Sequence, residues 1–384
     1  MSDVEFCFSK LNQTPDTNMS IISHSWVAFQ ASLFPNLCTC EKEHLTERIK
    51  GFLDVLETVD LDKHLSRGGA WTGRALIDRR SIARAYLAKA FYDLATTDLL
   101  IEILRLQPTL RKICGFERRK DVPSPATFSR AFREFAANGF GDMLLAALVV
   151  EYVGVKVVMH ESTDSTEIDA REKAKAKPKV EKPSEPPRKR GRPNKGEERP
   201  PKEPTGVARQ VKQTAKESLA ELSRECDWGT KTNSQGKKHS WKGYKSHISW
   251  ADDNIPLKAV TTSASVNDCL VAIPLMRTVA AEKVAVLYDL MDAAYDADAI
   301  AQVSRDLGHV PIIDPNPAHK REPLHPLHEE RYKERTTAER GNSRLKDQFG
   351  GRHVRVRGNA KVHMHVMWGL IVLFADQILK PIVC

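Results

Sequence analysis

The chain has 384 residues, of which 41% are hydrophobic and 28% charged, and it carries a net charge of +9. This length accommodates two domains, and the basic balance favours a polyanionic partner such as nucleic acid. The apolar runs at 143–150 and 366–375 are too short to span a bilayer, which argues against a membrane protein. Seven scattered cysteines show neither zinc-ligand spacing nor a disulfide framework, so we expect a soluble protein of the cytoplasm.

The first predicted domain, residues 1–150, is helical. Apolar residues recur at spacings of three and four and predict helices over 45–58, 80–95, 97–106 and 125–149. Ser124 stands at the N-cap position of the last helix, with Pro125 in its first turn. Arg130 and Arg133 would then lie on its first turns, as in a helix-turn-helix that binds DNA. The alternative is an ordinary helical bundle with a basic, solvated face.

The second predicted domain, residues 151–384, combines strands and helices. Strands are expected at 153–159, 239–250, 255–262, 284–288 and 309–313, and helices at 269–281, 294–306, 330–348 and 361–380. Three strands, a helix, a strand, a helix, a strand and a helix is the order of a ribonuclease-H-like sheet. The expected fold class is therefore mixed α+β, with a helical region followed by a ribonuclease-H-like domain.

A basic, proline-rich insertion interrupts the second domain at 171–204. It holds eight of the 21 prolines and 13 Lys and Arg residues against six Glu, with hardly an apolar side chain. Such a stretch cannot bury enough surface to offset its ordering entropy, so we expect a flexible segment. Arg190, Gly191 and Arg192 form the core of an AT-hook, which would lie in a narrow minor groove. A basic linker with no specific fit is the alternative.

Three acidic residues stand at informative places in this order of elements. Asp164 is expected just beyond the first strand, Asp292 just beyond the fourth, and Glu339 inside a long helix. In a ribonuclease-H-like fold these carboxylates converge. They could hold two Mg²⁺ ions, or Mn²⁺, for in-line phosphoryl displacement. Asp289 competes with Asp292 as the second ligand because it lies nearer the predicted strand.

The helix around Glu339 carries a second pattern. Tyr332, Arg335, Glu339 and Lys346 follow one another at offsets of three, four and seven, which places all four on one helix face. A phenol, a guanidinium, a carboxylate and an ammonium aligned in this way suit a site for metal and phosphate. This pattern resembles the Y-R-E-K signature of bacterial insertion-sequence transposases with a DDE active site.

Other segments agree with this resemblance. The stretch Gly243-Tyr-Lys-Ser-His247 is similar to a strand of that family, and Asp292-Ala-Ala-Tyr-Asp296 is similar to its Asp-x-Gly-Tyr-Asp box, with Ala294 in place of the usual Gly. Only 46 residues separate Asp292 from Glu339, which leaves little room for the large inserted β-domain of some related transposases.

The resemblance implies a metal-dependent DNA transposase, active in the bacterial cytoplasm at the nucleoid. It would bind the terminal inverted repeats of double-stranded DNA, cut at the transposon end and join the 3′-hydroxyl to target DNA, as a homodimer that holds two ends. The implied metal ligands are Asp164, Asp292 and Glu339. The implied DNA contacts are Tyr332, Arg335, Lys346 and, on a strand, Lys245. Two alternatives stay open: a catalytically silent DNA-binding regulator, and a nuclease of the same fold that cuts without joining.

Overall fold

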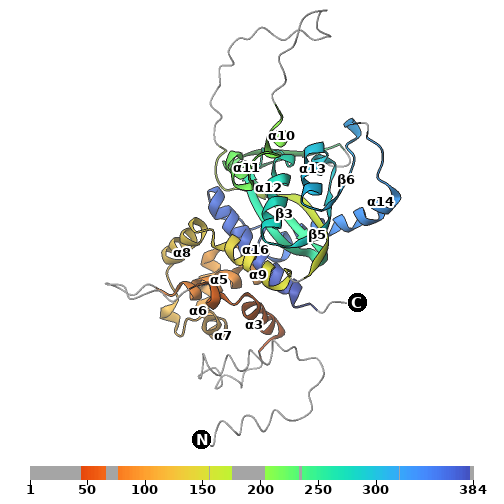
Figure 1. Cartoon of the computed structure of the whole chain (residues 1–384). Helices are drawn as coiled ribbons and strands as arrows, with labels where there is room; N and C mark the ends of the chain where they lie inside the picture. The colour runs from red at the N-terminus through yellow and green to blue at the C-terminus, as the bar shows by residue number, and fades with distance from the viewer. Residues whose placement is uncertain are drawn as a thin grey trace, which may run out of the picture.

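The computed structural model describes residues 45–65, 77–154, 156–174, 204–232, 236–319 and 321–380. Figure 1 shows a group of helices, red to yellow, beside a sheet that has helices on both faces. Most of the basic insertion, including Arg190 and Arg192, lies outside the described residues. Within the described ranges no single helix is long and apolar enough to cross a membrane, although two consecutive helices, bent by 61° at their junction, pass that test together.

The N-terminal group contains seven α-helices among the described residues. They are α3 (Glu47–Val59), α4 (Leu61–His64), α5 (Arg79–Phe91), α6 (Thr97–Leu106), α7 (Pro108–Ile113), α8 (Pro125–Ala137) and α9 (Phe140–Tyr152). Their starts follow from local chemistry, because the side chain of Thr46 accepts a hydrogen bond from the Ile49 amide, and Thr96 caps Leu99 in the same way. Pro125 occupies the first turn of α8, where its missing N–H costs nothing.

The helix predicted at 125–149 is two helices, so that prediction was wrong. The break comes at Gly139, which has a φ of 60° and precedes the first residue of α9. Such a left-handed conformation ends one helix and lets the next begin in a new direction, and glycine adopts it without a steric penalty. The apolar pattern continues across the break because both helices bury one face in the same core.

The sheet is mixed and has six strands in the described part of the chain. They are β1 (Val157–Asp169), β2 (Asp227–Thr232), β3 (Lys238–Ala251), β4 (Ile255–Ser263), β5 (Ala285–Met291) and β6 (Val310–Ile313). The order is β2-β3-β1-β5-β6, with β4 also paired to β3. β1, β5 and β6 run parallel to one another, whereas β3 is antiparallel to its three neighbours. The sheet therefore has parallel strands on one side of β1 and antiparallel strands on the other.

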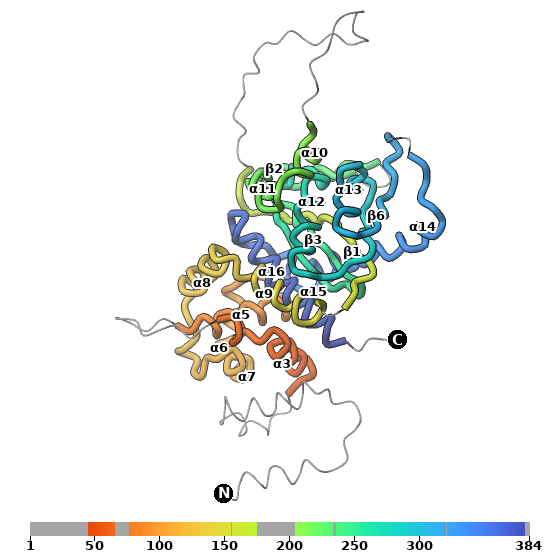
Figure 2. The backbone as a smooth tube through the Cα atoms, in the orientation of Figure 1, coloured from red at the N-terminus to blue at the C-terminus, as the bar shows by residue number. Residues whose placement is uncertain are grey.

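Helices cover both faces of this sheet. α12 (Cys269–Ala281) and α13 (Asp298–Asp306) lie on one face, where the Lys258 ammonium of β4 binds Glu282 at 2.7 Å. α15 (Thr336–Gln348) and α16 (Asn359–Ile378) lie on the other face, where Thr261 of β4 contacts the His363 ring at 2.9 Å. The result is a three-layer arrangement (Figures 1 and 2).

α16 joins the two parts of the molecule. It packs on β4 with one side and on α3, α5, α8 and α9 with the other. Its residues Val366–Ala375 are all buried, in a single hydrophobic cluster that also contains side chains of the N-terminal helices and of β3. Figure 1 shows this blue helix between the N-terminal group and the sheet. The helical group and the sheet thus share a core.

Several elements differ from the sequence-based expectation. β1 runs from Val157 to Asp169, so Asp164 lies inside the strand and not beyond it. The helix predicted at 330–348 is α14 (Pro326–Tyr332), a 3-10 turn at Lys333–Arg335, and α15. The helix predicted at 294–306 begins at Asp298, after a 3-10 turn at 293–295. Five of the described helices and strands were not predicted: α4, α7, β2, α10 (Gly206–Gln210) and α11 (Ala215–Glu221).

Candidate active site

Asp164 and Asp292 lie side by side at the end of β5. β1 and β5 are parallel, with Ser162 opposite Leu290. Two residues further along each strand, this register sets Asp164 level with Asp292, which follows the last residue of β5. Burial raises the pKa of the Asp164 carboxyl to about 6, the Asp292 carboxylate adds to that rise, and Arg335 and Lys231 oppose it. Burial likewise raises the pKa of Asp292.

α15 passes directly over Asp164. The Asn342 amide donates a hydrogen bond from Nδ2 to Asp164 Oδ2 at 3.0 Å. One residue earlier, Gly341 rests on the ring of Trp250 in β3, so closely that an added Cβ would lie 2.7 Å from the ring carbons. A glycine at this position lets the helix backbone approach the sheet, and that approach brings Asn342 within reach of the strand.

Arg335 stands among the three predicted acids. Its guanidinium donates a hydrogen bond to Glu339 Oε1 at 2.7 Å, and its charge acts on both Asp164 and Asp292. The Arg335 side chain is 17% exposed and that of Glu339 is 59% exposed. The guanidinium is therefore largely enclosed, whereas the Glu339 carboxylate is open to solvent. The Arg335 guanidinium also lies over the Tyr332 ring, with its Cζ 5.8 Å from the ring centroid. One fixed positive charge is therefore shared by three carboxylates.

Asp289, the competing second acid, lies on the opposite face of the sheet. It is fully buried and bonds to the Ser304 hydroxyl at 2.5 Å and to the His309 ring at 3.0 Å. Its neighbour across the strands is Glu161, also buried, and potential ligand atoms of Glu161, Asp289 and His309 all lie within 4.8 Å of one another. Ser304 belongs to α13 on one face of the sheet and Asn342 to α15 on the other, so the sheet separates this cluster from Asp164 and Asp292.

Comparison with known protein families decides what this geometry belongs to. A family model described as a transposase DDE domain matches residues 164–375, more than half of the chain, and its match begins at Asp164. The chain belongs to the DDE transposase family. A second model, described as a transposase domain (DUF772), matches residues 38–134. No curated protein and no solved structure matched the chain. The predicted identity as an insertion-sequence DDE transposase is thus confirmed, and this family consists of DNA-cleaving enzymes that use divalent metal ions.

The donor atoms around Asp164 fit such an ion. Asp164 and Asp292 supply hard carboxylate oxygens, the ligand type that Mg²⁺ and Mn²⁺ prefer. Burial, with a smaller contribution from the Asp292 charge, raises the pKa of Asp164, so the ionised carboxylate is unfavourable until a cation joins it. Asn342 Oδ1, in the same place, is buried and has no hydrogen-bond donor within the described residues. That orphaned oxygen is a further acceptor facing the acids of the transposase.

Two residues near these acids were not predicted from the sequence. Asn342 lies one helical turn after Glu339 in α15. The only signal in the sequence was an amide side chain at that spacing on a polar helix. Lys231 belongs to β2, a strand that was itself missed, and its charge acts on both Asp164 and Asp292. No pattern in the sequence connects Lys231 with residues more than 60 positions away.

The other predicted DNA contacts occupy different surroundings. The Lys245 ammonium is bound by Asp268 at 2.8 Å and by the Val266 carbonyl at 2.9 Å, so the structure shows protein groups as its partners. Lys346 approaches Glu167 at 3.7 Å, and burial lowers its pKa. Arg130 and Arg133 are exposed on α8, and Arg130 donates a hydrogen bond to the Thr127 hydroxyl at 3.3 Å.

The aspartate-tyrosine box after β5 shapes the rim of the transposase site. The Asp292 side chain accepts a hydrogen bond from the Ala294 amide at 2.9 Å, which fixes the turn that follows the strand. Tyr295 is buried, and its hydroxyl has no partner among the described residues. Asp296 is bound by the Asn316 amide at 2.9 Å and by Arg321 at 3.0 Å, so it ties the segment after β6 to this turn.

The buried Glu161 gives a testable pH dependence. Burial, and then the adjacent Asp289 carboxylate, hold the pKa of Glu161 well above its usual range near 4.5. A carboxyl with a raised folded-state pKa stabilises the fold fully below its unfolded pKa, and this contribution is lost as pH rises through the folded pKa. Between the unfolded-state and folded-state pKa of Glu161, the free energy of unfolding of the wild type should fall by up to about 1.4 kcal/mol per pH unit. We expect Glu161→Gln, which resembles the neutral carboxyl, not to show this fall.

Urea denaturation at a series of pH values between about 5 and about 9 measures this effect. Ser249 donates a hydrogen bond to Glu161 Oε1 at 2.6 Å, and the glutamine oxygen can accept the same bond. Glu102→Gln on the exposed side of α6 is the matched control and should follow the wild type. Parallel stability curves for the wild type and Glu161→Gln would refute the prediction.

Proposed function

We propose that this transposase binds the terminal inverted repeats of its element, cleaves at the transposon end and joins the 3′-hydroxyl to target DNA, with Asp164, Asp292 and Glu339 as ligands of two Mg²⁺ ions, or Mn²⁺. The observation that carries the proposal is the placement of Asp164 beside Asp292 at the end of β5, under a helix that bears Glu339. The sheet order and the covering helices support a ribonuclease-H-like catalytic domain after a helical DNA-binding region.

Divalent ions bound between these acids would activate the attacking oxygen and stabilise the leaving oxygen of an in-line phosphoryl displacement. Asp164 is held in place by the pairing of β1 with β3 and the Asp292 carboxylate by the Ala294 amide, so they need little reorganisation to act as ligands. Glu339 is the exposed member of the set and is bound to Arg335. Its Oε1 accepts the hydrogen bond from Arg335, which leaves Oε2 as the oxygen that would bind a metal while this ion pair persists.

The cations of the site have a second role in this proposal. Once the acids are neutralised by metal, the Arg335 guanidinium is free to bind a DNA phosphate in bidentate fashion. Tyr332 lies beside Arg335 and can donate its phenolic hydrogen to the same phosphodiester. Lys346 comes seven residues after Glu339, about 10 Å further along the α15 axis at 1.5 Å per residue. It would contact the DNA backbone as a point charge. Two DNA ends have to be held for joining, which favours a homodimer on DNA.

The test uses the full chain, Mg²⁺ and duplex DNA that carries the ends of the element. We expect cleavage at the ends and covalent joining of the 3′-hydroxyl strand to a second duplex, both abolished by chelation of the metal. Gel electrophoresis of end-labelled DNA separates the products. Cleavage without joining would identify a nuclease, and specific end binding without cleavage in Mg²⁺ or Mn²⁺ would identify a DNA-binding regulator. Either result would overturn the proposal.

A further inference from the structure

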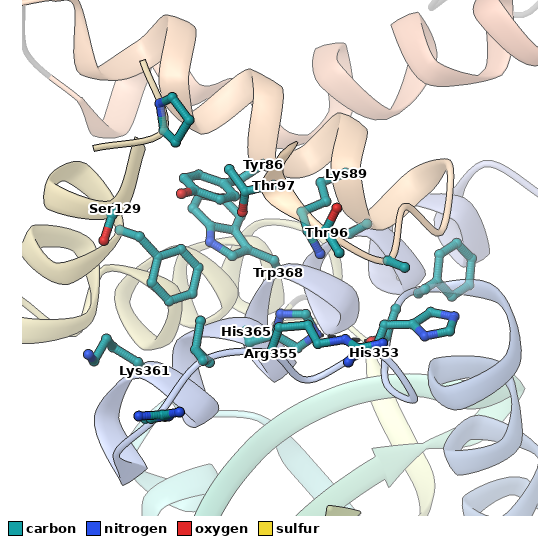
Figure 3. Close-up of a pocket in the computed structure, with 18 residues that line it drawn as sticks. Tyr86, Lys89, Thr96, Thr97, Ser129, His353, Arg355, Lys361, His365 and Trp368 are labelled. Atoms are coloured by element: carbon teal, nitrogen blue, oxygen red, sulfur yellow. Dashed lines mark hydrogen bonds between the residues drawn. The ribbon is translucent and has the colours of Figure 1, made fainter. Parts of the chain in front are cut away.

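A cavity of about 320 Å³ lies between the N-terminal helices and the segment that follows α15. Figure 3 shows its walls: α5, the start of α6 and α8 on one side, and residues 349–357 with the first turns of α16 on the other. The cavity is at the end of α15 remote from Glu339, about 15 Å along the helix axis at 1.5 Å per residue. It is therefore separate from the acidic site but within a few nucleotides of it on a DNA strand.

The charged residues that line this cavity are all basic. They are Lys89, Arg355, Arg357 and Lys361, accompanied by two histidines, and no carboxylate belongs to the lining. Throughout the described ranges, the side chains of Arg355, Arg357 and Lys361 form neither a hydrogen bond nor an ion pair. A solvent-exposed arginine without a partner is ordinary. Four unneutralised cations around one hollow indicate a site that takes negative charge from a ligand.

Lys89 is the most informative of these cations. Its side chain points from α5 into the cavity (Figure 3), and the residue is only 8% exposed. It has no hydrogen-bond partner in the described structure, and only the charge of Asp93, on the turn after the helix, acts in its favour. Burial lowers the pKa of Lys89 to about 8. Keeping an unpaired ammonium buried costs free energy, and an anion in the cavity would offset that cost.

An aromatic wall lies beside the cations, because Tyr86 shares α5 with Lys89 and Trp368 shares α16 with Lys361. Tyr86 and Trp368 stack with their ring centroids 5.9 Å apart, and Phe132 meets Tyr86 edge-on. All three line the cavity. The Trp368 Nε1–H is buried and has no acceptor in the part of the chain that the structure describes. A ligand that suits this wall has a flat apolar face and a hydrogen-bond acceptor, in addition to the negative charge that suits the cations beside it.

We propose that this cavity binds one unpaired nucleotide, with its phosphate at Lys89 and Arg355 and its base against the Tyr86–Trp368 wall. A phosphate and a heteroaromatic base supply together the charge, the flat face and the acceptor that the lining lacks. The volume suits a ligand of this size, and a DNA duplex cannot enter it. The source is a single-stranded stretch of DNA or a free nucleotide. The inference rests on the proposed function only in taking DNA as the natural source.

The experiment measures binding without metal, in EDTA, so that cleavage plays no part. The probes are a fluorescein-labelled single-stranded oligonucleotide, the blunt duplex of the same sequence, and dAMP. By fluorescence anisotropy we expect Lys89→Met and Arg355→Ala each to weaken single-strand binding about tenfold, the loss of one charge-assisted contact. Trp368→Phe, which keeps an aromatic ring but removes the indole N–H, should weaken it several-fold. Duplex binding should change less than about twofold in all three variants.

The controls separate charge and stability from the site itself. Lys216→Met, on the exposed side of α11, removes the same charge elsewhere and should bind like the wild type. Lys89→Met removes a buried charge while methionine fills the same space, so thermal unfolding should show a fold at least as stable. Competition by dAMP, with deoxyadenosine as the uncharged comparison, reports the source. Displacement of the single strand by dAMP but not by deoxyadenosine supports a nucleotide site open to both sources.

Two results would overturn the inference. One is single-strand and duplex binding that fall equally in Lys89→Met and Arg355→Ala, which would indicate a general basic surface. The other is single-strand and dAMP binding that do not change in any cavity variant. Neither result depends on the acids, because binding is measured in EDTA. A failure of end cleavage would be seen only in the assay that contains Mg²⁺. Failure of this inference and failure of the proposed function are therefore seen in different measurements.

Discussion

Asp292→Asn is expected to reduce cleavage of the transposon end by at least about a thousandfold, because a metal ligand in phosphoryl transfer is worth several kcal/mol and each 1.36 kcal/mol is tenfold in rate. The substitution keeps the shape of the side chain, and the amide oxygen can still accept the hydrogen bond from Ala294 N, now 2.9 Å long. The turn after β5 should therefore persist. Far-ultraviolet circular dichroism and DNA binding without metal should match the wild type.

Asp289→Asn provides the contrast, since the sequence alone left the two acids in competition. Asp289 faces away from Asp164 and is enclosed by Ser304 and His309. Removing its charge leaves a buried histidine without its ion partner, so we expect a loss of about 2–4 kcal/mol in the free energy of unfolding. Cleavage per folded molecule should stay within about tenfold of the wild type. The opposite pattern, with Asp289→Asn inactive and Asp292→Asn active, would reverse the assignment of the second acid.

The order of the longer strands and helices and the face of α15 could be predicted from the sequence, because they depend on local periodicity, whereas short elements such as β2, α10 and α11 could not. Strand and helix patterns set the sequence of elements, and the three- and four-residue spacing around Glu339 aligned Arg335 with it on one face. Arg335 and Glu339 are indeed bonded in the structure. The spacing was informative although a 3-10 turn precedes α15, since residues in both kinds of helix follow nearly the same face over a few positions.

The extent of β1 could not be predicted in this way. Its second half reads Glu161-Ser-Thr-Asp164-Ser-Thr-Glu167, and acids and serines are poor strand formers. The strand continues because each of these residues from Ser162 onward is paired with β3. Two of its carboxylates are bound by groups that come from distant parts of the chain, Glu161 by Ser249 and Asp164 by Asn342. Tertiary pairing thus overrides local propensity where the candidate site is built.

The nucleotide cavity has the same origin. Its cations come from α5, from the segment after α15 and from α16, and no motif joins these regions. In the sequence, Arg355 and Arg357 belong to an unremarkable basic run, and Trp368 to an apolar helix for which packing is the expected role. Only the packing of α16 on the N-terminal helices brings an unpaired lysine, two arginines and an indole N–H to one hollow.

The contact between Gly341 and Trp250 sets the height of α15 above the acids. An alanine Cβ at position 341 would lie 2.7 Å from the Cε3 and Cζ3 atoms of the indole, closer than such atoms can approach. Trp250 is fully buried and has no room to move aside, so the helix has to shift. We expect Gly341→Ala to lower the free energy of unfolding by about 1–3 kcal/mol. Cleavage per folded molecule should fall about a hundredfold, since small misplacements of catalytic groups carry that penalty.

Urea denaturation and end cleavage, each measured on the same preparations, test this coupling. Ser343→Ala, two residues away on the exposed side of α15, should leave both quantities near wild type. The sharper control is the double variant Gly341→Ala with Trp250→Phe. The clashing atoms belong to the indole's six-membered ring, and the buried Trp250 Nε1 has no partner among the described residues, so phenylalanine removes the obstacle without breaking a bond shown there. Partial recovery of cleavage in the double variant would show that the distance of α15 from the sheet, and not stability alone, determines the cleavage rate. Equal cleavage by Gly341→Ala and the wild type would show that α15 does not position the transposase's acids.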